Sequence, residues 1–290
     1  MTVRVVVFGA AGQLGFELQR TVPPGHTVIP LVLNDADIRV RDAVADAIGA
    51  TRPDVVVNCA AFTNVDGAES AGDAAMATNG VAPGIVAEEA GRARARMLHI
   101  STDYVFDGCA NSPYAVGATP NPLSVYGATK LEGERRVLAA GIGAVVVRTA
   151  WLHSSVGTNF VRTAVRLLTS GKGMRVVDDQ IGTPTRARHL ATALWRLAEQ
   201  RDVAGIVHFT DAGVGSWYDV AMAVVDSLRD RGKLAAGASV EPISSAQWRS
   251  VARRPLYSVL DKHDSWQRIG FVPPHWSHGV AATTEELLDA

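Results

Sequence analysis

Apolar residues in the first half of the chain form short continuous runs that alternate with stretches of helical periodicity. The runs are rich in Val and Ile and end at Gly, Pro, Asn or Asp, as is typical of buried parallel strands. This alternation predicts an α/β fold built on a doubly wound parallel sheet. The predicted strands are residues 3–8, 27–32, 55–58, 96–100 and 144–147, and the predicted helices are residues 12–21, 42–50, 73–90 and 124–139.

The second half of the chain is less regular. Its predicted helices are residues 159–170, 187–199 and 217–229, and its predicted short strands lie near 175–177, 206–209 and 240–243. These elements lack phosphate-binding loops. We therefore expect residues 1–150 to form the nucleotide-binding domain and residues 151–290 to form mainly a smaller substrate-binding lobe, with some elements returning to the first domain.

A glycine-rich loop joins the first predicted strand to the first predicted helix, where it spells Gly9-Ala10-Ala11-Gly12-Gln13-Leu14-Gly15. Small residues allow a sharp turn and let a pyrophosphate approach the N–H groups of the helix. The spacing alone is weak evidence, but its position at the start of a βαβ unit favours a Rossmann-type dinucleotide site. We predict that Gly9, Gly12, Gln13, Leu14 and Gly15 contact the cofactor.

Acidic residues follow about 20 positions after this loop. Asp35 or Asp37 could bond an adenosine ribose, Asp37-Ile38 could flank the adenine, or either Asp could cap the next helix. Asp35 would oppose a 2′-phosphate, whereas Arg39 and Arg41 would favour one. The choice between NAD and NADP stays open at this point.

Tyr126 and Lys130 lie four residues apart in a predicted helix, so both face the same side. A free Tyr has a pKa of about 10, and a nearby ammonium is expected to lower the pKa of the phenol for proton exchange with a substrate. Thr102 follows the predicted strand 96–100, at the end where parallel sheets bind ligands. We predict Thr102, Tyr126 and Lys130 as catalytic residues.

Composition narrows the possible functions. Of 290 residues, 47% are apolar, and 28 basic residues nearly balance 29 acidic ones, which argues against a nucleic-acid partner. No apolar stretch reaches the roughly 18 residues of a membrane span, and the first apolar run meets Gly9 too early for a signal peptide. Cys59 and Cys109 suggest no disulfide framework. We expect a reduced, cytoplasmic protein without a membrane partner.

The motifs together resemble the extended short-chain dehydrogenase/reductase family and, more closely, its dTDP-4-dehydrorhamnose reductase branch. The resemblance covers most of the chain, and residues 102–108 and 179–185 are its most specific parts. The matching segments are residues 12–18, 58–66, 101–108, 121–130, 148–151, 178–185 and 253–255.

The resemblance implies that NAD(P)H, with NADPH slightly preferred, reduces the carbon-4 ketone of dTDP-4-dehydro-L-rhamnose. Tyr126 would donate the proton, Lys130 would tune Tyr126 and hold the nicotinamide ribose, and Thr102 would orient the ketone oxygen. The partner is therefore a dTDP-sugar, and the assembly is a homodimer at most.

Further contacts follow from the same resemblance. Asp103 and Trp151 would contact the sugar, and Val65 would lie close to it. The backbone at Ala60, Ala61 and Thr63 would line the cofactor.

Three positions depart from the family pattern. His153 replaces an aromatic hydroxyl, and Tyr257 replaces an Asn that is usual at a substrate contact. Some members bind Mg²⁺ at a dimer interface through three glutamates, of which two map to Glu17 and Glu286 and the third to Arg188. We therefore predict no metal, and a salt bridge from Arg188 to one of these acids.

Two alternatives stay open. One is an epimerase or 4,6-dehydratase for nucleotide sugars on the same scaffold, although Tyr104 stands where dehydratases have a Glu after Thr-Asp. The other is a non-catalytic NADP-binding regulatory subunit, which the intact Thr102, Tyr126 and Lys130 disfavour.

Overall fold

The computed structural model describes residues 3–141 and 143–289, and its main body is a six-stranded sheet in the order β10-β5-β4-β3-β1-β2. Every neighbouring pair of strands in this sheet is parallel, which confirms the doubly wound α/β fold. The strands are β1 (Val3–Phe8), β2 (His26–Leu31), β3 (Val55–Asn58), β4 (Arg96–Thr102), β5 (Val145–Thr149) and β10 (Gly205–His208).

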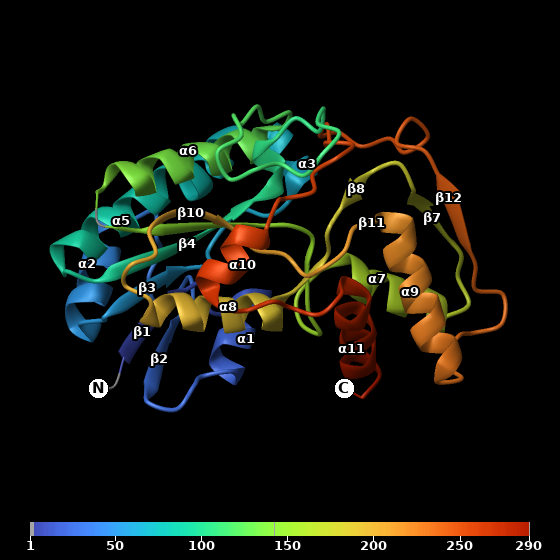
Figure 1. Cartoon of the computed structure of the whole chain (residues 1–290), viewed down its shortest axis with the longest axis horizontal. Helices are drawn as coiled ribbons and strands as arrows, with labels where there is room; N and C mark the ends of the chain where they lie inside the picture. Colours follow the sequence, from blue (N-terminus) through green and yellow to red (C-terminus); the bar gives the residue numbers. More distant parts are fainter. Residues whose placement is uncertain (1–2, 142, 290) are drawn as a thin grey trace.

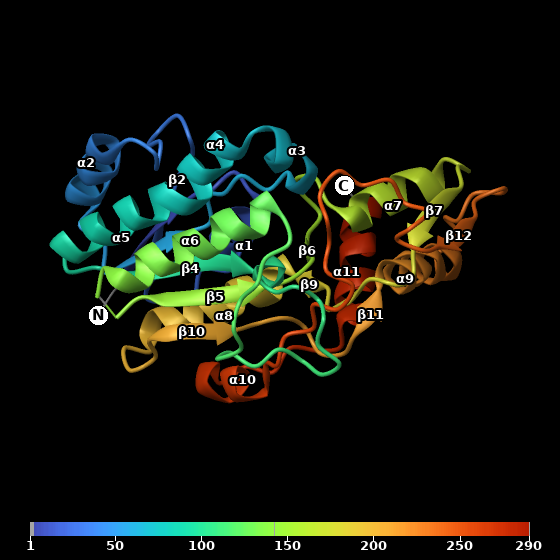
Figure 2. The ribbon, with the colours of Figure 1, turned by 90° about the horizontal axis from the view of Figure 1, so that it is seen from above.

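Helices cover both faces of the sheet (Figures 1 and 2). One layer holds α2 (Arg41–Thr51), α5 (Ala82–Arg92) and α6 (Val125–Ala139), and the other holds α1 (Gln13–Arg20), α8 (Ala187–Glu199) and α10 (His263–Ile269). Side chains of β1 alternate between the layers, because successive strand residues point to opposite faces. Val5 and Val7 pack toward α1 and α8, whereas Val6 and Phe8 pack toward α2 and α5.

The strand order reverses beside β1, since β2 lies on one side of it and β3 on the other. Ligands of open parallel sheets bind outside the carboxyl ends of the strands at such a reversal. Phe8 of β1 pairs with Asn58 of β3, so the glycine loop after Phe8 and the segment after Asn58 emerge side by side.

The prediction of one continuous α-helix at residues 73–90 is wrong, because a π-helical segment interrupts it. The structure has α3 (Val65–Ser70) and α4 (Gly72–Ala75), followed by a π-helical segment, η1 (Met76–Val81), which leads into α5. A π turn is wider than an α turn and often occurs at functional sites. Asn79 lies within η1 and is fully buried, and its role is described below.

The second half of the chain contributes the strand β10 and the covering helices α8 and α10 to the main body, and it builds a lobe from its other elements. The lobe's core joins α7, α9 and α11 (Figure 1). Its elements are β6 (Leu152–His153), α7 (Phe160–Thr169), β7 (Met174–Val177), β8 (Ile181–Gly182), β9 (Thr185–Arg186), β11 (Gly215–Ser216), α9 (Trp217–Asp230), β12 (Val240–Ile243) and α11 (Trp276–Leu288). Across residues 3–141 and 143–289, no helix combines the length and apolar character needed to cross a membrane.

Candidate active site

The glycine loop is shaped by close backbone contacts that only glycine permits. Gly9 has a φ of +79°, and a Cβ there would lie 2.6 Å from the nitrogen of Ala60. A Cβ on Gly15 would lie 2.5 Å from the Cα of Ala10. The loop therefore lies against the segment that follows β3, and the chain turns sharply from β1 into α1.

The first turn of α1 offers free donors. Gly12 is the N-cap and supplies no side-chain acceptor. Within the described residues, the backbone N–H groups of Gln13, Leu14 and Gly15 have no acceptor. Such a helix start attracts anions. That this helix start holds the pyrophosphate of a dinucleotide stays a prediction.

The side chain of Gln13 is tied to the lobe. Its Oε1 accepts hydrogen bonds from Asn159 Nδ2 at 2.9 Å and from Ser154 Oγ at 3.3 Å. The cofactor loop and the lobe are thus connected directly through this amide.

The segment after β3 is held by a residue that sequence reasoning missed. The side-chain amide of Asn79 accepts from Phe62 N at 2.8 Å and donates to Phe62 O at 2.9 Å. This clamp fixes the backbone of Ala60, Ala61 and Thr63, the predicted cofactor contacts. In the sequence, the one feature that could have indicated this role is that Asn79 is a single Asn in an Ala-rich stretch.

The acidic segment after β2 has local partners. The carboxylate of Asp37 forms an ion pair with Arg39 at 2.6 Å, which lowers the pKa of Asp37. Ile38 is 4% exposed and packs in the core beneath α2. Asp35 accepts from Val32 N at 2.9 Å. Contacts from Asp37 and Ile38 to an adenosine stay predictions.

Tyr126 and Lys130 stand one turn apart in α6, which Ser124 caps by accepting from Gly127 N. The Nζ of Lys130 donates to the carbonyl oxygen of Ile100 in β4 at 2.6 Å. Lys130 is 3% exposed, and this burial lowers the pKa of its amine to about 8.

The phenol of Tyr126 has its pKa raised to about 12, because burial opposes the phenolate more than the nearby Thr102 hydroxyl favours it. This direction is opposite to the sequence expectation. The physical reason is that the Lys130 amine is engaged with Ile100, so desolvation dominates. The ring of Tyr126 meets that of Tyr104 edge-on, with centroids 6.0 Å apart.

Thr102 ends β4 and adjoins Tyr126. Its Oγ1 donates to Asp103 Oδ1 at 3.0 Å and accepts from Tyr104 N at 3.2 Å. Asp103 is 1% exposed, and burial raises the pKa of its carboxyl to about 7. Its Oδ2 has no hydrogen-bond partner in the described chain. The structure thus brings Thr102 and Tyr126 together beside a carboxyl that is easily protonated.

Trp151 and Val65 border the same region. Trp151 follows β5 and has a φ of +48°, a strained conformation for a bulky residue. Its indole stacks on Trp217 at 3.8 Å, a contact with the lobe that sequence reasoning did not find. Val65 is partly buried at the start of α3, which Asn64 caps.

Two departures from the family pattern have structural roles. His153 Nδ1 lies 3.1 Å from Thr283 Oγ1, and burial lowers the pKa of this imidazole to about 3, so it is neutral. Tyr257 forms a backbone bridge with Ile181 and is partly buried.

The predicted salt bridge of Arg188 is confirmed. Its Nε lies 3.1 Å from Glu17 Oε2, and its Nη1 lies 3.5 Å from Glu286 Oε1. Arg186 also pairs with Glu286, at 2.7 Å. A guanidinium between two carboxylates does not fit an Mg²⁺ site, because it supplies positive charge and no oxygen ligand.

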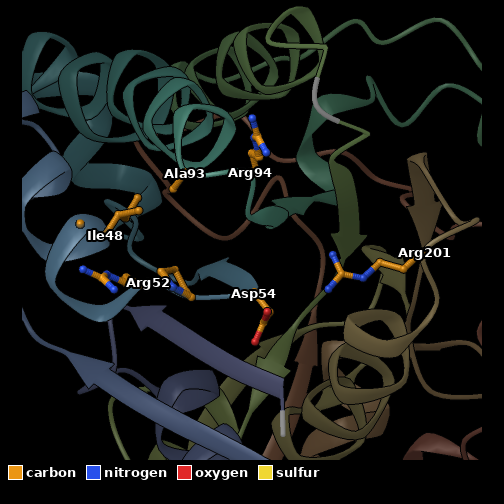
Figure 3. Close-up of a pocket in the computed structure, with 8 residues that line it drawn as sticks. Ile48, Arg52, Asp54, Ala93, Arg94 and Arg201 are labelled. Atoms are coloured by element: carbon orange, nitrogen blue, oxygen red, sulfur yellow. The ribbon is translucent and has the colours of Figure 1, made fainter. Parts of the chain in front are cut away.

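A cavity of about 460 Å³ lies elsewhere, near the amino ends of the strands (Figure 3). Arg52, Asp54, Arg94 and Arg201 line it. Arg52 and Arg94 follow α2 and α5, where cations offset helix dipoles. This cavity is at the opposite end of the sheet from the glycine loop, and we assign it no role in catalysis.

The fold and the site define a class of protein. A doubly wound sheet, a glycine cradle at its reversal point and a Tyr-x-x-x-Lys helix beside the end of β4 characterise the short-chain dehydrogenases/reductases of the extended type.

Comparison with known proteins specifies the family. The family described as RmlD substrate binding domain matches residues 3–288, and the chain belongs to this family. The chain is 38% identical to the dTDP-4-dehydrorhamnose reductase of Burkholderia thailandensis, with 99% of each covered. It is 41% identical to a probable dTDP-4,6-dihydroxy-2-methyloxan-3-one 4-ketoreductase of Streptomyces antibioticus, with 99% of this chain and 97% of the relative covered.

A solved structure agrees with these relatives. The dTDP-4-dehydrorhamnose reductase of Bacillus anthracis, in complex with NADP, is 32% identical and superposes with a TM-score of 0.91. The match covers 99% of this chain and 100% of that one.

Proposed function

We propose that this protein reduces the carbon-4 ketone of dTDP-4-dehydro-L-rhamnose to dTDP-L-rhamnose, using NADPH or NADH. The observation that best supports this is the placement of Tyr126 and Lys130 in one helix next to Thr102, which ends β4 at the same carboxyl edge of the sheet from which the glycine loop emerges after β1. Relatives named as dTDP-4-dehydrorhamnose reductases, matched over 99% of the chain, supply the substrate.

The proposed chemistry divides among the residues. When bound, the reduced nicotinamide supplies the hydride. Thr102 donates a hydrogen bond to the ketone oxygen, and Tyr126 transfers its proton to that oxygen as negative charge develops there. With a pKa of about 12, the phenol of Tyr126 is fully protonated at neutral pH, as an acid must be before reduction. In the structure Lys130 donates to the carbonyl oxygen of Ile100, and we assign its ammonium to the nicotinamide ribose and to the Tyr126 phenolate once the cofactor is bound.

Binding is assigned to the flanking residues. We place the pyrophosphate on the N–H groups of Gln13, Leu14 and Gly15, and the sugar near Asp103 and Trp151. NADPH is our preferred cofactor, in line with the NADP complex of the Bacillus anthracis relative. A homodimer and a boundary between domains at residue 150 are also part of the proposal.

A second candidate substrate has a specific basis. The Streptomyces antibioticus relative, at 41% identity, acts by its name on a different dTDP-ketosugar. The active-site residues would be the same, and only the contacts with the sugar would differ.

A coupled assay tests the function. Purified protein is given dTDP-4-dehydro-L-rhamnose with NADPH or NADH, and loss of reduced nicotinamide is followed by absorbance. We expect Tyr126→Phe to lower kcat by about 10²–10⁴-fold, the usual contribution of a positioned acid. The control is Tyr114→Phe, which removes a phenolic hydroxyl that donates to Asp107 Oδ1 at 2.8 Å.

The outcomes separate the alternatives. No ketone-dependent oxidation by the parent protein would exclude the rhamnose assignment, and oxidation with a related dTDP-ketosugar alone would favour the second substrate. Near-parent rates in Tyr126→Phe would exclude Tyr126 as the acid. Protein purified with NAD already bound would favour an epimerase or dehydratase.

A further inference from the structure

Helix α6 carries a buried carboxylate in line with Tyr126 and Lys130. Glu134 follows Lys130 by four residues, so it lies one turn further along the same face. It is 1% exposed. A carboxylate is rarely buried to this extent without strong partners.

Glu134 is bound from two adjacent strands. Arg148 of β5 donates to it through two nitrogens, Nε to Oε1 at 2.9 Å and Nη2 to Oε2 at 2.7 Å. Ser101 of β4 donates its hydroxyl to Oε1. A bidentate pair fixes orientation as well as distance. Arg148 is 2% exposed, so the pair is shielded from water.

These contacts hold α6 against the ends of β4 and β5, next to the predicted catalytic residue Thr102. Ser101 pairs with Arg148, and Thr102 pairs with Thr149, in the register of β4 and β5. Ser101 directly precedes Thr102. The carboxylate of Glu134 therefore couples the helix that carries Tyr126 to the strand end that carries Thr102.

The negative charge of Glu134 also favours the protonated form of Lys130 and so raises the pKa of its amine. The other titratable groups that act on Lys130 are Cys59, after β3, and His99, in β4. Burial raises the pKa of the Cys59 thiol to about 12 and lowers the pKa of His99 well below its usual value, so both are neutral near pH 7. Glu134 is therefore the negative charge that opposes the desolvation of the Lys130 ammonium.

We propose that Glu134, held by Arg148 and Ser101, is a positioning residue that sets the register of Tyr126 and Lys130 against Thr102 and keeps Lys130 as an ammonium. This inference builds on the proposed reductase function. Glu134 itself touches neither sugar nor cofactor, so it acts entirely through Lys130 and the helix.

The test is the variant Glu134→Gln, which keeps the shape of the side chain and removes its charge. We expect kcat/KM to fall by about 10–100-fold, as for other residues that position a catalytic group. The alkaline limb of the pH profile, which reports loss of the Lys130 proton, is expected to move to lower pH. Glu134→Asp keeps the charge and is expected to keep the parent's pH profile, even with a lower rate.

Two further variants make the result decisive. Glu132→Gln is the matched control, since Glu132 pairs with Arg136 on the exposed face of the same helix at 2.7 Å; it should leave rate and profile unchanged. If the unpaired Arg148 prevents Glu134→Gln from folding, the double variant Glu134→Gln with Arg148→Gln replaces both charges and is measured instead.

A second readout separates this inference from the proposed function. The pH dependence of NADPH affinity, measured by fluorescence titration, depends on Lys130 and requires no sugar. If the parent fails to reduce the ketone but Glu134→Gln shifts this binding profile to lower pH, the reductase assignment falls and the role of Glu134 stands. Superimposable binding and rate profiles for the parent and Glu134→Gln would overturn it, as would a parent that does not bind NADPH.

Discussion

The buried ammonium of Lys130 lowers the stability of the folded protein, because burial disfavours a charged group. Its amine is 3% exposed, and its one hydrogen bond within the described chain goes to the carbonyl of Ile100. Because its pKa falls to about 8 in the folded protein, the unfolded chain binds more protons between pH 8 and the ordinary Lys pKa of about 10.4. The destabilisation that the buried ammonium causes therefore shrinks as pH rises across that window.

Replacing Lys130 with Met is expected to abolish activity and to stabilise the fold at pH 7 by about 2 kcal/mol, since an apolar side chain fills the site without desolvation. The gain should shrink as pH rises toward 10. Urea unfolding at pH 7 and pH 9.5 measures both effects, with exposed Lys233→Met as the control. A Lys130→Met protein less stable than the parent at pH 7 would contradict this account.

The local motifs of the site could be predicted from the sequence, and its long-range contacts could not. The glycine loop and the Tyr126–Lys130 pair each lie within a few residues, so their spacing alone places them. Asn79 and Phe62 are 17 residues apart, and Glu134 and Arg148 are 14 apart. Nothing in a single sequence indicates which buried polar residues meet once the strands and helices pack.

Among the elements, α6 depends most strongly on glycine. A Cβ on Gly133 would lie 2.2 Å from the carbonyl oxygen of Asn79, so the helix packs backbone to backbone against η1. The same wide turn presents Asn79 to Phe62. The packing of α6 therefore also holds the loop that contains Ala60 and Ala61.

Gly133→Ala should push α6 away from η1, destabilising the protein by about 2 kcal/mol or more and weakening NADPH binding. Gly49→Ala is the matched comparison. Gly49 lies inside α2, and a methyl group added to it would meet no atom within 4 Å apart from its own helix backbone and chain neighbours, so Ala should stabilise there by about 0.5–1 kcal/mol. Chemical denaturation measures the free energy of unfolding of each variant relative to the parent. Equal effects would show that helix propensity, and not contact with η1, decides the outcome.

Elements with a clear hydrophobic pattern could be predicted from the sequence, and elements without one could not. Strands β1, β3 and β5 are Val-rich runs, and the predicted positions of all the main-sheet strands agree closely with the structure. The π turn at η1 escaped prediction because apolar periodicity does not reveal an inserted residue. The short strands β6, β8, β9 and β11 are two residues long and are defined by their partners, which the sequence does not name.

For the molecule as a whole, ion pairs join the sheet domain to the lobe. Arg188 lies in α8 and binds Glu17 of α1 and Glu286 of α11, two helices from opposite ends of the chain. Gln13 and Asn159 make a second connection near the glycine loop. These polar contacts therefore help to hold the cofactor cradle and the lobe in place relative to each other.

The charge of Arg188 leads to a prediction about metals. The parent's melting temperature should be unchanged by about 10 mM Mg²⁺ or by EDTA, since the guanidinium occupies the space between the two carboxylates. Arg188→Glu should lose about 2–4 kcal/mol without metal, because Glu17 is almost fully buried and would face like charge.

Mg²⁺ should restore part of that loss, because three carboxylates supply the oxygen ligands that it prefers. For a dissociation constant of about 1 mM, about 10 mM Mg²⁺ would return about 1.4 kcal/mol. Arg175→Glu, a charge reversal beside Glu241 at the far side of the lobe, should show no response to Mg²⁺. A parent protein stabilised by Mg²⁺, or an Arg188→Glu variant that ignores it, would show that these three positions do not decide metal binding in this chain.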